Sequence, residues 1–548
     1  MVTRSRTGER DVVVVGGGPI GLVAALLLAD AGVRTTVVEK ATAPGDLPRA
    51  ISLQDESFRT FEQLGVADAL KTESLLDTGS RYFGLGERLL LEARPVASRL
   101  GHPAKTQFDQ PDLERLLWDR AVAHEGLEFL RGAEATAIAQ DATGVTVTVT
   151  VDGVDRTLEA TWLVGADGGR SFTRSALGID LVGTTQPQRW IVVDLLGETR
   201  AHDPFAEFHC DGERPYVLVP GVRGRLRIEF MLFDHEDADA MTTPEQIRAL
   251  VVPRFRSSLD PADVRRAVVY VAHQRVARTY RAGRAFLVGD AAHLMPPFAG
   301  QGLNAGVRDA TNLAWKLVAA VRGTDAERLL DTYEDERRAH GASMVAVSRR
   351  IGAVVMATNP VATRLRDAVV RAASLVPRVR DHLANMRFIT PADYVAGVAV
   401  APARGTPATA QVGRALSQPA VVAADGRVTG LDAHLGAGWA LLQVGGPPGW
   451  RGDRHPYWAG IGATVLRVLP PGVEPGPGEV AELEPVLTSQ AEGHGAPVPA
   501  EPVFVAVRPD RYVAAVFTAG GEQRAVDGLR TFIDDRAPAV GQAREEAA

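Results

Sequence analysis

The sequence DVVVVGGGPIGLVAALLLADAGVRTTVVEK, residues 11–40, decides the fold of the first part of the chain. Four consecutive valines, residues 12–15, are typical of a strand buried on both faces. They lead into the spacing G-x-G-x-x-G, formed by Gly16, Gly18 and Gly21, and then into an apolar helix. In such a turn the first glycine permits the tight bend, the second lets the backbone approach a pyrophosphate, and the third lets helix and strand pack closely. The stretch therefore predicts a dinucleotide-binding turn.

An acidic residue stands where a ribose would lie. A second strand, residues 33–38, follows the helix and ends at Glu39. This carboxylate follows the glycine turn at roughly the 20-residue distance at which an acid accepts ribose hydroxyls. The phosphate needs no basic side chain, because a helix N-terminus offers free N–H groups and positive partial charge. The pattern favours FAD or NAD over the structural alternative, a glycine turn in an ordinary βαβ unit.

Length and composition narrow the class of protein. A chain of 548 residues exceeds one ordinary core, and we expect three domains. No apolar run approaches the ~20 residues that span a bilayer. The single cysteine, Cys210, excludes an intrachain disulfide and favours a reducing compartment. A net charge of −7 without a clustered basic face argues against nucleic acid as a partner. We expect a cytoplasmic protein without membrane or nucleic-acid partners.

Residues 181–275 change in character to short strands with turn residues between them, which predicts an inserted antiparallel sheet. His209, Tyr216 and Arg227 are candidate substrate-binding residues of this sheet, although polar residues on a half-exposed sheet are often solvated. Arg223, Arg225 and Arg227 alternate along one predicted strand, so they share a face and offer partners for a substrate carboxylate.

The dinucleotide fold resumes at GRAFLVGDAAHLMPPFAGQGLNAGVRDA, where a strand, residues 286–288, ends at Asp290. Asp290 can hydrogen-bond polyol hydroxyls. Free N–H groups around residues 302–304 can stabilise negative charge on a reduced flavin. His293, beside this packed turn, is more often structural than catalytic.

Three further residues are candidates for cofactor contact, and the first two also permit a structural interpretation. Arg49, in a loop, is either solvated or uses its planar fork on a phosphate or carboxylate. Gln110 either caps a helix or contacts a cofactor. Asp167 follows a predicted strand and a glycine-bearing turn, at the edge of the sheet where ligands bind.

Together these motifs resemble a known family. GGGPIG with Glu39, DGGRSFTR with Asp167, and GDAAHLMPPFAGQGLN with Asp290 are similar to the three signatures of the single-component FAD-dependent aromatic hydroxylases, the flavoprotein monooxygenases related to p-hydroxybenzoate hydroxylase. PRAISLQDES, FDQPDLE and FHCDGERPYVLVPG resemble the 3-(3-hydroxyphenyl)propionate hydroxylase branch. The resemblance extends over residues 10–345.

The resemblance and the patterns imply an α/β fold class. We expect a Rossmann-type FAD-binding domain in two parts, residues 10–180 and 276–398, with an antiparallel β-sheet substrate domain, residues 181–275, inserted between them. A C-terminal thioredoxin-like domain, residues 408–535, is also expected. It lacks a C-x-x-C motif, so it has no dithiol redox role and is left with packing or dimerisation into a homodimer.

The resemblance also implies site residues. Asp167 is expected to serve both FAD and NAD(P)H, and Pro297 to lie near the isoalloxazine, while no catalytic side chain and no metal ligand are assigned. The residues assigned to FAD are Gly16, Gly18, Gly21, Glu39, Lys40, Arg49, Gln110, Asp167, Asp290, Gly302, Leu303 and Asn304.

The expected activity is an FAD-dependent monooxygenase that uses NAD(P)H as transient co-substrate and O₂ to hydroxylate a phenolic substrate, ortho to its hydroxyl, through a flavin hydroperoxide. A tailoring hydroxylase of a polycyclic aromatic substrate is the close alternative, and a non-enzymatic FAD-binding interaction protein is the distant one. A flavin halogenase is disfavoured because no tryptophan stands in a W-x-W-x-I-P motif.

Overall fold

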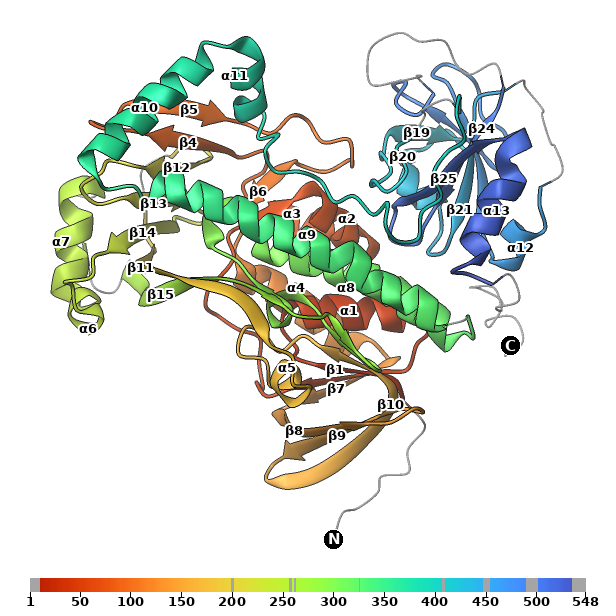
Figure 1. The fold of residues 1–548 in the computed structure, drawn as a ribbon, viewed down its shortest axis with the longest axis horizontal. Helices are drawn as coiled ribbons and strands as arrows, with labels where there is room; N and C mark the ends of the chain where they lie inside the picture. Colours follow the sequence, from red (N-terminus) through yellow and green to blue (C-terminus); the bar gives the residue numbers. More distant parts are fainter. Residues whose placement is uncertain are drawn as a thin grey trace.

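The computed structural model describes residues 10–198, 202–255, 259–260, 263–324, 326–406, 410–446, 454–488 and 501–534. These residues form two eight-stranded sheets, a seven-stranded sheet and a two-stranded ribbon. Figure 1 shows the C-terminal sheet and its helices as a separate unit beside the long helices α8 and α9. Among the described residues, no helix is long and apolar enough to cross a bilayer.

The first sheet is the predicted dinucleotide-binding sheet. Its main strands, in spatial order, are β16 (Arg281–Ala282), β17 (Ala285–Leu287), β10 (Val154–Gly165), β1 (Arg10–Val15), β2 (Thr35–Glu39) and β7 (Leu127–Arg131). From β17 to β7 every neighbouring pair is parallel, so the carboxyl ends of these strands share one edge. The first half of β10 instead pairs antiparallel with β9 (Val145–Val151), which pairs with β8 (Ala133–Gln140). The valine run of β1 is fully buried, as its composition predicts.

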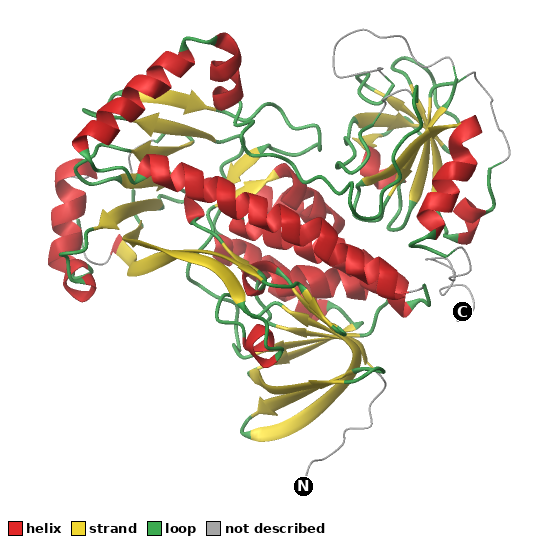
Figure 2. Cartoon of the chain, in the orientation of Figure 1, coloured by secondary structure: helices red, strands yellow, loops and turns green. Residues whose placement is uncertain are grey.

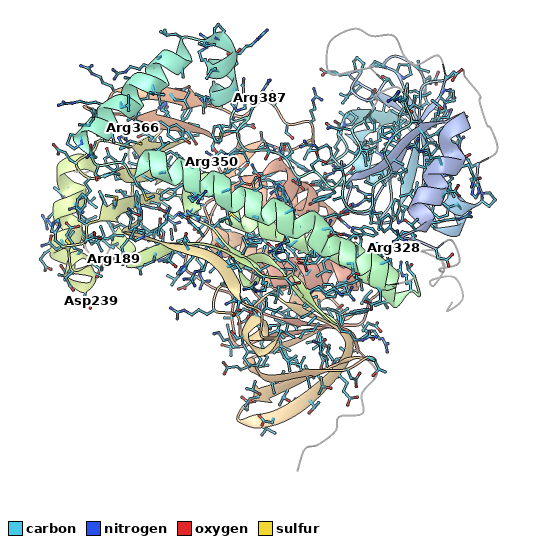
Figure 3. All side chains as sticks on the ribbon, viewed as in Figure 1. Arg189, Asp239, Arg328, Arg350, Arg366 and Arg387 are labelled. Atoms are coloured by element: carbon cyan, nitrogen blue, oxygen red, sulfur yellow. The ribbon has the colours of Figure 1, made fainter. Side chains whose placement is uncertain are left out.

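Helices cover one face of this sheet. The helix α1 (Pro19–Asp30) packs against α8 (Gly302–Val321) and α4 (Gln110–Ala123), and their apolar side chains form the largest core. The helix α9 (Ala326–Val355) packs along α8 and reaches the second sheet, and Figure 3 labels Arg328 and Arg350 near its two ends. The remaining α-helices are α2 (Asp55–Gln63), α3 (Ala67–Thr72), α5 (Phe172–Ala176), α6 (Ala238–Met241), α7 (Pro244–Phe255), α10 (Pro360–Ser374), α11 (Pro377–Ala384), α12 (Tyr457–Gly460) and α13 (Glu522–Arg530).

The second sheet includes the predicted insertion and three strands from outside it, β4 (Gly79–Phe83), β5 (Leu89–Ala93) and β18 (His293–Leu294). Its order is β18, β15 (Val264–Ala277), β11 (Leu181–Leu195), β14 (Leu226–Leu232), β13 (Tyr216–Pro220), β12 (Phe205–His209), β4 and β5. Neighbouring strands are antiparallel except β4 and β12, which are parallel. The pairing of β4 with β12 joins segments more than a hundred positions apart, which no local pattern signals.

Side chains alternate between the two faces of this second sheet. One face carries Ile191, Leu218 and Phe230, which pack with Ile247 and Val251 of α7. The other face carries Trp190, Phe208, Val217 and Met231, which cluster with Phe298 from the dinucleotide domain. We call these the outer face and the inner face. Only the inner face is turned towards the dinucleotide domain.

The third sheet belongs to the C-terminal unit. Its order is β20 (Val428–Gly430), β19 (Ala420–Ala423), β23 (Glu479–Glu482), β22 (Thr464–Leu469), β21 (Ala440–Val444), β24 (Val503–Val507) and β25 (Val513–Thr518). The two central pairs, β23 with β22 and β22 with β21, are parallel, and the pairs on either side of them are antiparallel. Figure 2 shows helices beside this sheet. The α/β fold class is confirmed. The thioredoxin-like character of this unit stays a prediction, and parts of its range, 408–409, 447–453, 489–500 and 535, lie outside the described residues.

Candidate active site

A cavity of about 2680 Å³ lies between the carboxyl edge of the first sheet and the inner face of the second. Pockets for a single small ligand are typically ~300–1,000 Å³. This cavity therefore has room for a dinucleotide and a second ligand together.

The glycine turn forms one end of the cavity. Gly16 has φ 110°, and a Cβ there would lie 2.5 Å from the carbonyl oxygen of Ala166. A Cβ on Gly21 would lie 1.9 Å from the carbonyl oxygen of Gly16, so this glycine is needed for helix packing rather than for lining the cavity. A Cβ on Gly18 would meet no atom within 4 Å, because this residue faces the cavity. The turn thus leaves open space at the N-terminus of α1, as a bound pyrophosphate requires.

The carboxylate of Glu39 lies beside this turn at the end of β2. Its Oε2 accepts a hydrogen bond from Gly17 N–H at 2.6 Å, and its Oε1 accepts one from Ala41 N–H at 2.7 Å. Lys40 follows it, and both residues line the cavity. The backbone therefore fixes the carboxylate at the position predicted for a ribose partner.

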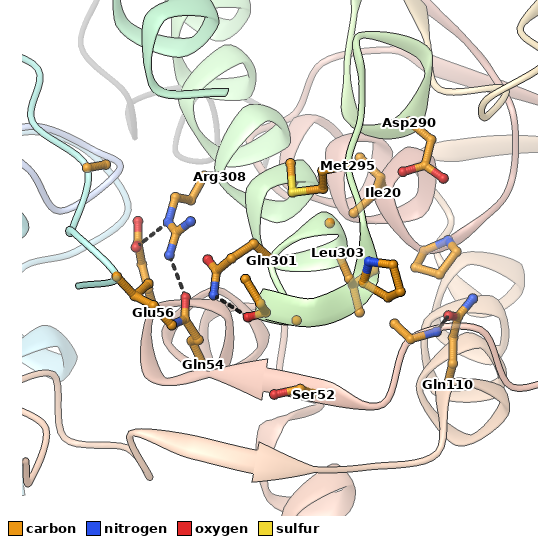
Figure 4. A pocket seen from close by; sticks show the side chains of 18 of the residues that line it. Ile20, Ser52, Gln54, Glu56, Gln110, Asp290, Met295, Gln301, Leu303 and Arg308 are labelled. Carbon is orange, nitrogen blue, oxygen red and sulfur yellow. Dashed lines mark hydrogen bonds and ion pairs between the residues drawn. The ribbon is translucent and has the colours of Figure 1, made fainter. Parts of the chain in front are cut away.

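Asp290 faces the middle of the cavity from a short 3₁₀ turn (Gly289–Ala291). Surrounding protein raises the pKa of its carboxyl group by desolvation, which nearby His293 and Arg49 partly oppose. Figure 4 shows Asp290 and Leu303 among the side chains that line the cavity, and Leu303 is the second residue of α8. Pro297, in a second 3₁₀ turn, and the first residues of α8 also line the cavity.

The loop that carries Arg49 is held from two sides. Gln110 Oε1 accepts a hydrogen bond from Ala50 N–H at 2.6 Å. Arg227 donates to the carbonyl oxygen of Arg49 at 2.7 Å and to that of Pro48 at 2.5 Å. Arg49 and Gln110 both line the cavity, so these contacts present the Arg49 side chain to it.

Asp167 lines the cavity but its carboxylate is already engaged. It accepts hydrogen bonds from the Ser171 hydroxyl at 2.5 Å and from Thr173 N–H at 2.8 Å, at the start of α5. Asn304 is fully buried and does not line the cavity. Its Oδ1 accepts from Gln54 N–H at 2.9 Å, and its amide nitrogen donates to the carbonyl oxygen of Gly300 at 2.7 Å. Its side chain braces the start of α8.

The predicted substrate residues His209 and Tyr216 lie on the outer face of the second sheet. Their rings stack at 4.1 Å, and His209 Nδ1 is 2.5 Å from a carboxylate oxygen of Glu87. Neither lines the cavity, whereas their chain neighbours Phe208 and Val217 do. We therefore do not retain His209 or Tyr216 as substrate residues, because a strand sends successive side chains to opposite faces.

The three arginines predicted as carboxylate partners already have partners within the protein. Arg227 pairs with Asp194 at 2.8 Å, and both side chains are almost fully buried. Arg225 pairs with Asp109, and Arg223 precedes the strand and pairs with Glu73 and Asp112. Arg227 does line the cavity, as predicted, but its charge is already compensated.

His293 is fully buried and pairs with Asp309 at 2.8 Å, behind the cavity wall. Asp309 also accepts a hydrogen bond from Arg337 at 2.8 Å. This contact pattern agrees with the structural interpretation of His293. The described residues contain no cluster of histidine, cysteine or acidic side chains that would hold a metal ion.

The sequence reasoning missed a buried acid on the inner face. Tyr270 of β15 donates a hydrogen bond to Glu229 Oε2 of β14 at 3.0 Å, and both residues line the cavity. Burial raises the pKa of Glu229, although Arg227 opposes the shift. Burial and the neighbouring carboxylate also raise the pKa of Tyr270, which keeps its hydroxyl a donor. An acid between apolar neighbours in RLRIEFML was the one available signal.

Comparison with known proteins agrees with this geometry. Residues 9–348 match the FAD binding domain family, and residues 413–532 match the HcaD C-terminal domain family. A 3-(3-hydroxy-phenyl)propionate/3-hydroxycinnamic acid hydroxylase of Mycolicibacterium smegmatis is 38% identical over 84% of this chain and 82% of its own length. One of the same description from Burkholderia cenocepacia is 37% identical over 96% of this chain and 97% of its own.

Solved structures show the same architecture. The anhydrotetracycline hydroxylase OxyS of Streptomyces rimosus superposes with a TM-score of 0.73 and 28% identity, over 96% of this chain and 99% of its own. The flavin-dependent monooxygenase PieE, solved with FAD and substrate, shares the fold with a TM-score of 0.77, 24% identity, and coverage of 97% and 100%.

The chain therefore belongs to the family of FAD-dependent aromatic hydroxylases. Within that family, its curated relatives place it with the 3-(3-hydroxyphenyl)propionate hydroxylase branch, as its motifs predict. It is an oxidoreductase with FAD as its cofactor, and the non-enzymatic alternative is not retained.

Proposed function

We propose that this enzyme hydroxylates a phenol carrying a short acidic side chain, ortho to the existing hydroxyl, with NAD(P)H as reductant. The balanced reaction takes phenol, O₂, NAD(P)H and a proton to the catechol, water and NAD(P)⁺. One oxygen atom is inserted into a ring C–H bond to give the new hydroxyl group, and the other leaves as water. The observation that carries the proposal is a single cavity that joins the glycine turn to the inner face with its Glu229–Tyr270 pair.

The cavity residues fit FAD. The open space at Gly18 admits a pyrophosphate, Glu39 can accept ribose hydroxyls, and Asp290 can hold the polyol chain. Gly302 and Leu303 begin α8 and line the cavity, so N–H groups of this first helical turn would be available to a flavin ring. When bound, the cofactor would supply acceptance of two electrons from a nicotinamide and activation of O₂.

The chain positions and activates the phenol. Glu229 has one carboxylate oxygen engaged by Tyr270, and no described residue donates to its Oε1. A carboxylate whose pKa is raised by burial is a stronger base, so it can accept the phenolic hydrogen. Removing that proton pushes electron density to the ortho and para carbons. The apolar side chains of Phe208, Val217 and Val219 exclude water from the ring.

The test compares three phenols on the purified holoenzyme: 3-(3-hydroxyphenyl)propionate, phenol and a naphthol. We expect oxygen-dependent NAD(P)H consumption to be most tightly coupled to catechol formation with the propionate, identified by mass spectrometry. Consumption without hydroxylated product from any of them would contradict the proposal.

A hydroxylase of polycyclic substrates is the second candidate. It is favoured by the large cavity and by the structural similarity to an anhydrotetracycline hydroxylase. If only the naphthol is hydroxylated while the propionate merely stimulates peroxide release, this candidate replaces the first.

A further inference from the structure

An uncompensated lysine lines the cavity at the edge of the inner face. Lys105 begins β6 (Lys105–Gln107), which pairs with β3 (Ser52–Gln54). Its Nζ donates to the carbonyl oxygen of Gly79 at 3.0 Å and to the Ser80 hydroxyl at 2.7 Å. An ammonium group has three donors, so one donor remains for a further partner.

No carboxylate within the described ranges lies within 4 Å of Lys105 Nζ. Two other cations that line the cavity have carboxylate partners: Arg227 pairs with Asp194 at 2.8 Å, and Arg308 pairs with Glu56 at 2.5 Å. Burial lowers the pKa of Lys105 to about 8. Lys105 is half-buried, and a partly desolvated cation without a counter-ion is destabilised, which an anion supplied by a ligand relieves.

The surroundings of Lys105 fit an aromatic acid. On the inner face, Tyr82, Phe208, Val217 and Glu229 are successive cross-strand neighbours on β4, β12, β13 and β14. Tyr82 and Phe208 stack at 4.8 Å. Three strand spacings separate the ends of this row, about 14 Å between backbones.

The two polar groups lie at opposite ends of this row. Ser80, which holds Lys105, stands two residues before Tyr82 on the same strand and face, while Glu229 ends the row. The row thus has an ammonium group at one end, aromatic and aliphatic side chains in the middle, and a carboxyl group at the other. Lys105 and Glu229 both line the cavity, and a single ring with a short acid chain matches this order of groups.

We propose that Lys105 binds the carboxylate of the aromatic substrate, with the phenolic hydroxyl placed at Glu229. This inference rests on the proposed function for the identity of the substrate. It assigns the acid-binding role to a residue from the first part of the chain, in place of the paired arginines Arg223, Arg225 and Arg227. Anchoring the acid also fixes which ring carbon faces the flavin, because both ends of the substrate are held.

The competing role of Lys105 is structural, since its two hydrogen bonds tie β6 to β4. Two neutral variants separate the roles. Lys105→Met keeps the stem and removes the charge, while Lys105→Gln also keeps a donor for Gly79 and Ser80. Lys71→Met is the matched control, because Lys71 lies on α3 and pairs with an exposed Asp68 at 3.3 Å.

Binding is measured by calorimetry on the oxidised holoenzyme without NAD(P)H, using 3-(3-hydroxyphenyl)propionate and the corresponding propanol. We expect the neutral Lys105 variants to raise the Kd of the acid by about 10- to 100-fold, the size typical of a lost charged hydrogen bond. The Kd of the alcohol should change by less than about threefold, and Lys71→Met should change neither.

Equal weakening of acid and alcohol, or an unchanged Kd for the acid, would overturn the proposal. If Lys105→Met does not fold, Lys105→Gln decides by the same criterion. Failure of the proposed function is recognised separately, because it is read from product formation by the unmodified enzyme. In that case 3-phenylpropionate, which lacks the hydroxyl, still tests the carboxylate site against 3-phenylpropanol.

Discussion

Charged side chains occur both in the buried interface with the C-terminal unit and on the cavity wall, but they are compensated differently. At the interface, Glu336 of α9 accepts hydrogen bonds from Lys316 at 2.9 Å, from Asn312 at 2.6 Å and from Arg508 at 2.7 Å. Arg508 also pairs with Asp510 at 2.5 Å. The ionised side chains of this group are at most 1% exposed, and each has an opposite charge beside it.

On the cavity wall the compensation is incomplete. Lys105 has no carboxylate neighbour among the described residues, and Asp290 and Glu229 have pKa values raised by desolvation. Glu336 is shifted the other way, because Arg508 and Lys316 outweigh the effect of its burial and lower its pKa to about 2.

At the interface, the charge of Glu336 is compensated by two cations, Lys316 and Arg508. Burial lowers the pKa of Lys316 to about 8, although its contact with Glu336 opposes that shift. Arg508 and Lys316 both lower the pKa of Glu336. Fully compensated charges hold the two units together, and incompletely compensated charges mark where ligands complete the structure.

The largest effect is expected at the glycine turn. Gly18→Leu should give protein without bound flavin, because its side chain would enter the space left for the pyrophosphate. Flavin absorbance per mole of purified protein measures this. Gly520→Leu is the control, since that glycine also has open space around it but lies in the C-terminal unit. Full flavin content in Gly18→Leu would mean that the turn does not bind the cofactor.

At the interface, Glu336→Gln should lower the free energy of unfolding by about 3–5 kcal/mol. The buried cations Lys316 and Arg508 would then lose a carboxylate that compensates their charge. Asp335→Asn, at the exposed neighbouring position on α9, should change it by about 0.5 kcal/mol or less. Denaturant titration followed by tryptophan fluorescence measures both. Similar values for the two variants would mean that the network contributes no more than surface charges.

The pH dependence of the free energy of unfolding tests the compensation of the Glu336 charge. The folded-state pKa of Glu336, about 2, lies below its ordinary value of 4.5. Its contribution is therefore fully present above pH 4.5 and is lost as the pH falls towards 2. We expect the melting temperature to drop through this window in the unmodified protein and to drop less in Glu336→Gln. A parallel pH dependence in the two proteins would contradict this assignment.

The smallest effect is expected on the outer face. His209→Gln should change kcat/KM by less than about twofold, since this side chain does not line the cavity. Phe208→Ala, one residue earlier and on the inner face, should weaken substrate binding at least about tenfold through lost apolar contact. Steady-state kinetics with the preferred phenol compares them. A larger effect of His209→Gln on kcat/KM would mean that the outer face takes part in substrate binding or catalysis.

The sequence by itself determined the dinucleotide end of this protein. Short motifs contain the residues Gly16, Gly18, Glu39 and Asp290. The position of each is set by a neighbouring strand, turn or helix start, and it does not depend on distant segments of the chain. These positions depend on backbone geometry within a few residues, which explains why the motifs also identified the family.

Only the tertiary structure decided the substrate end. Whether Tyr216 or Val217 faces the cavity depends on which face of the sheet is covered, since one step along a strand reverses every side chain. The strand β4 joins that sheet from far away in sequence, and the Lys105 ammonium reaches the inner face only through this long-range pairing. Asp194 and Asp109 pair with Arg227 and Arg225, which the strand pattern suggests as partners for a substrate carboxylate. Charge compensation between distant segments is set by three-dimensional packing, and no local pattern records it.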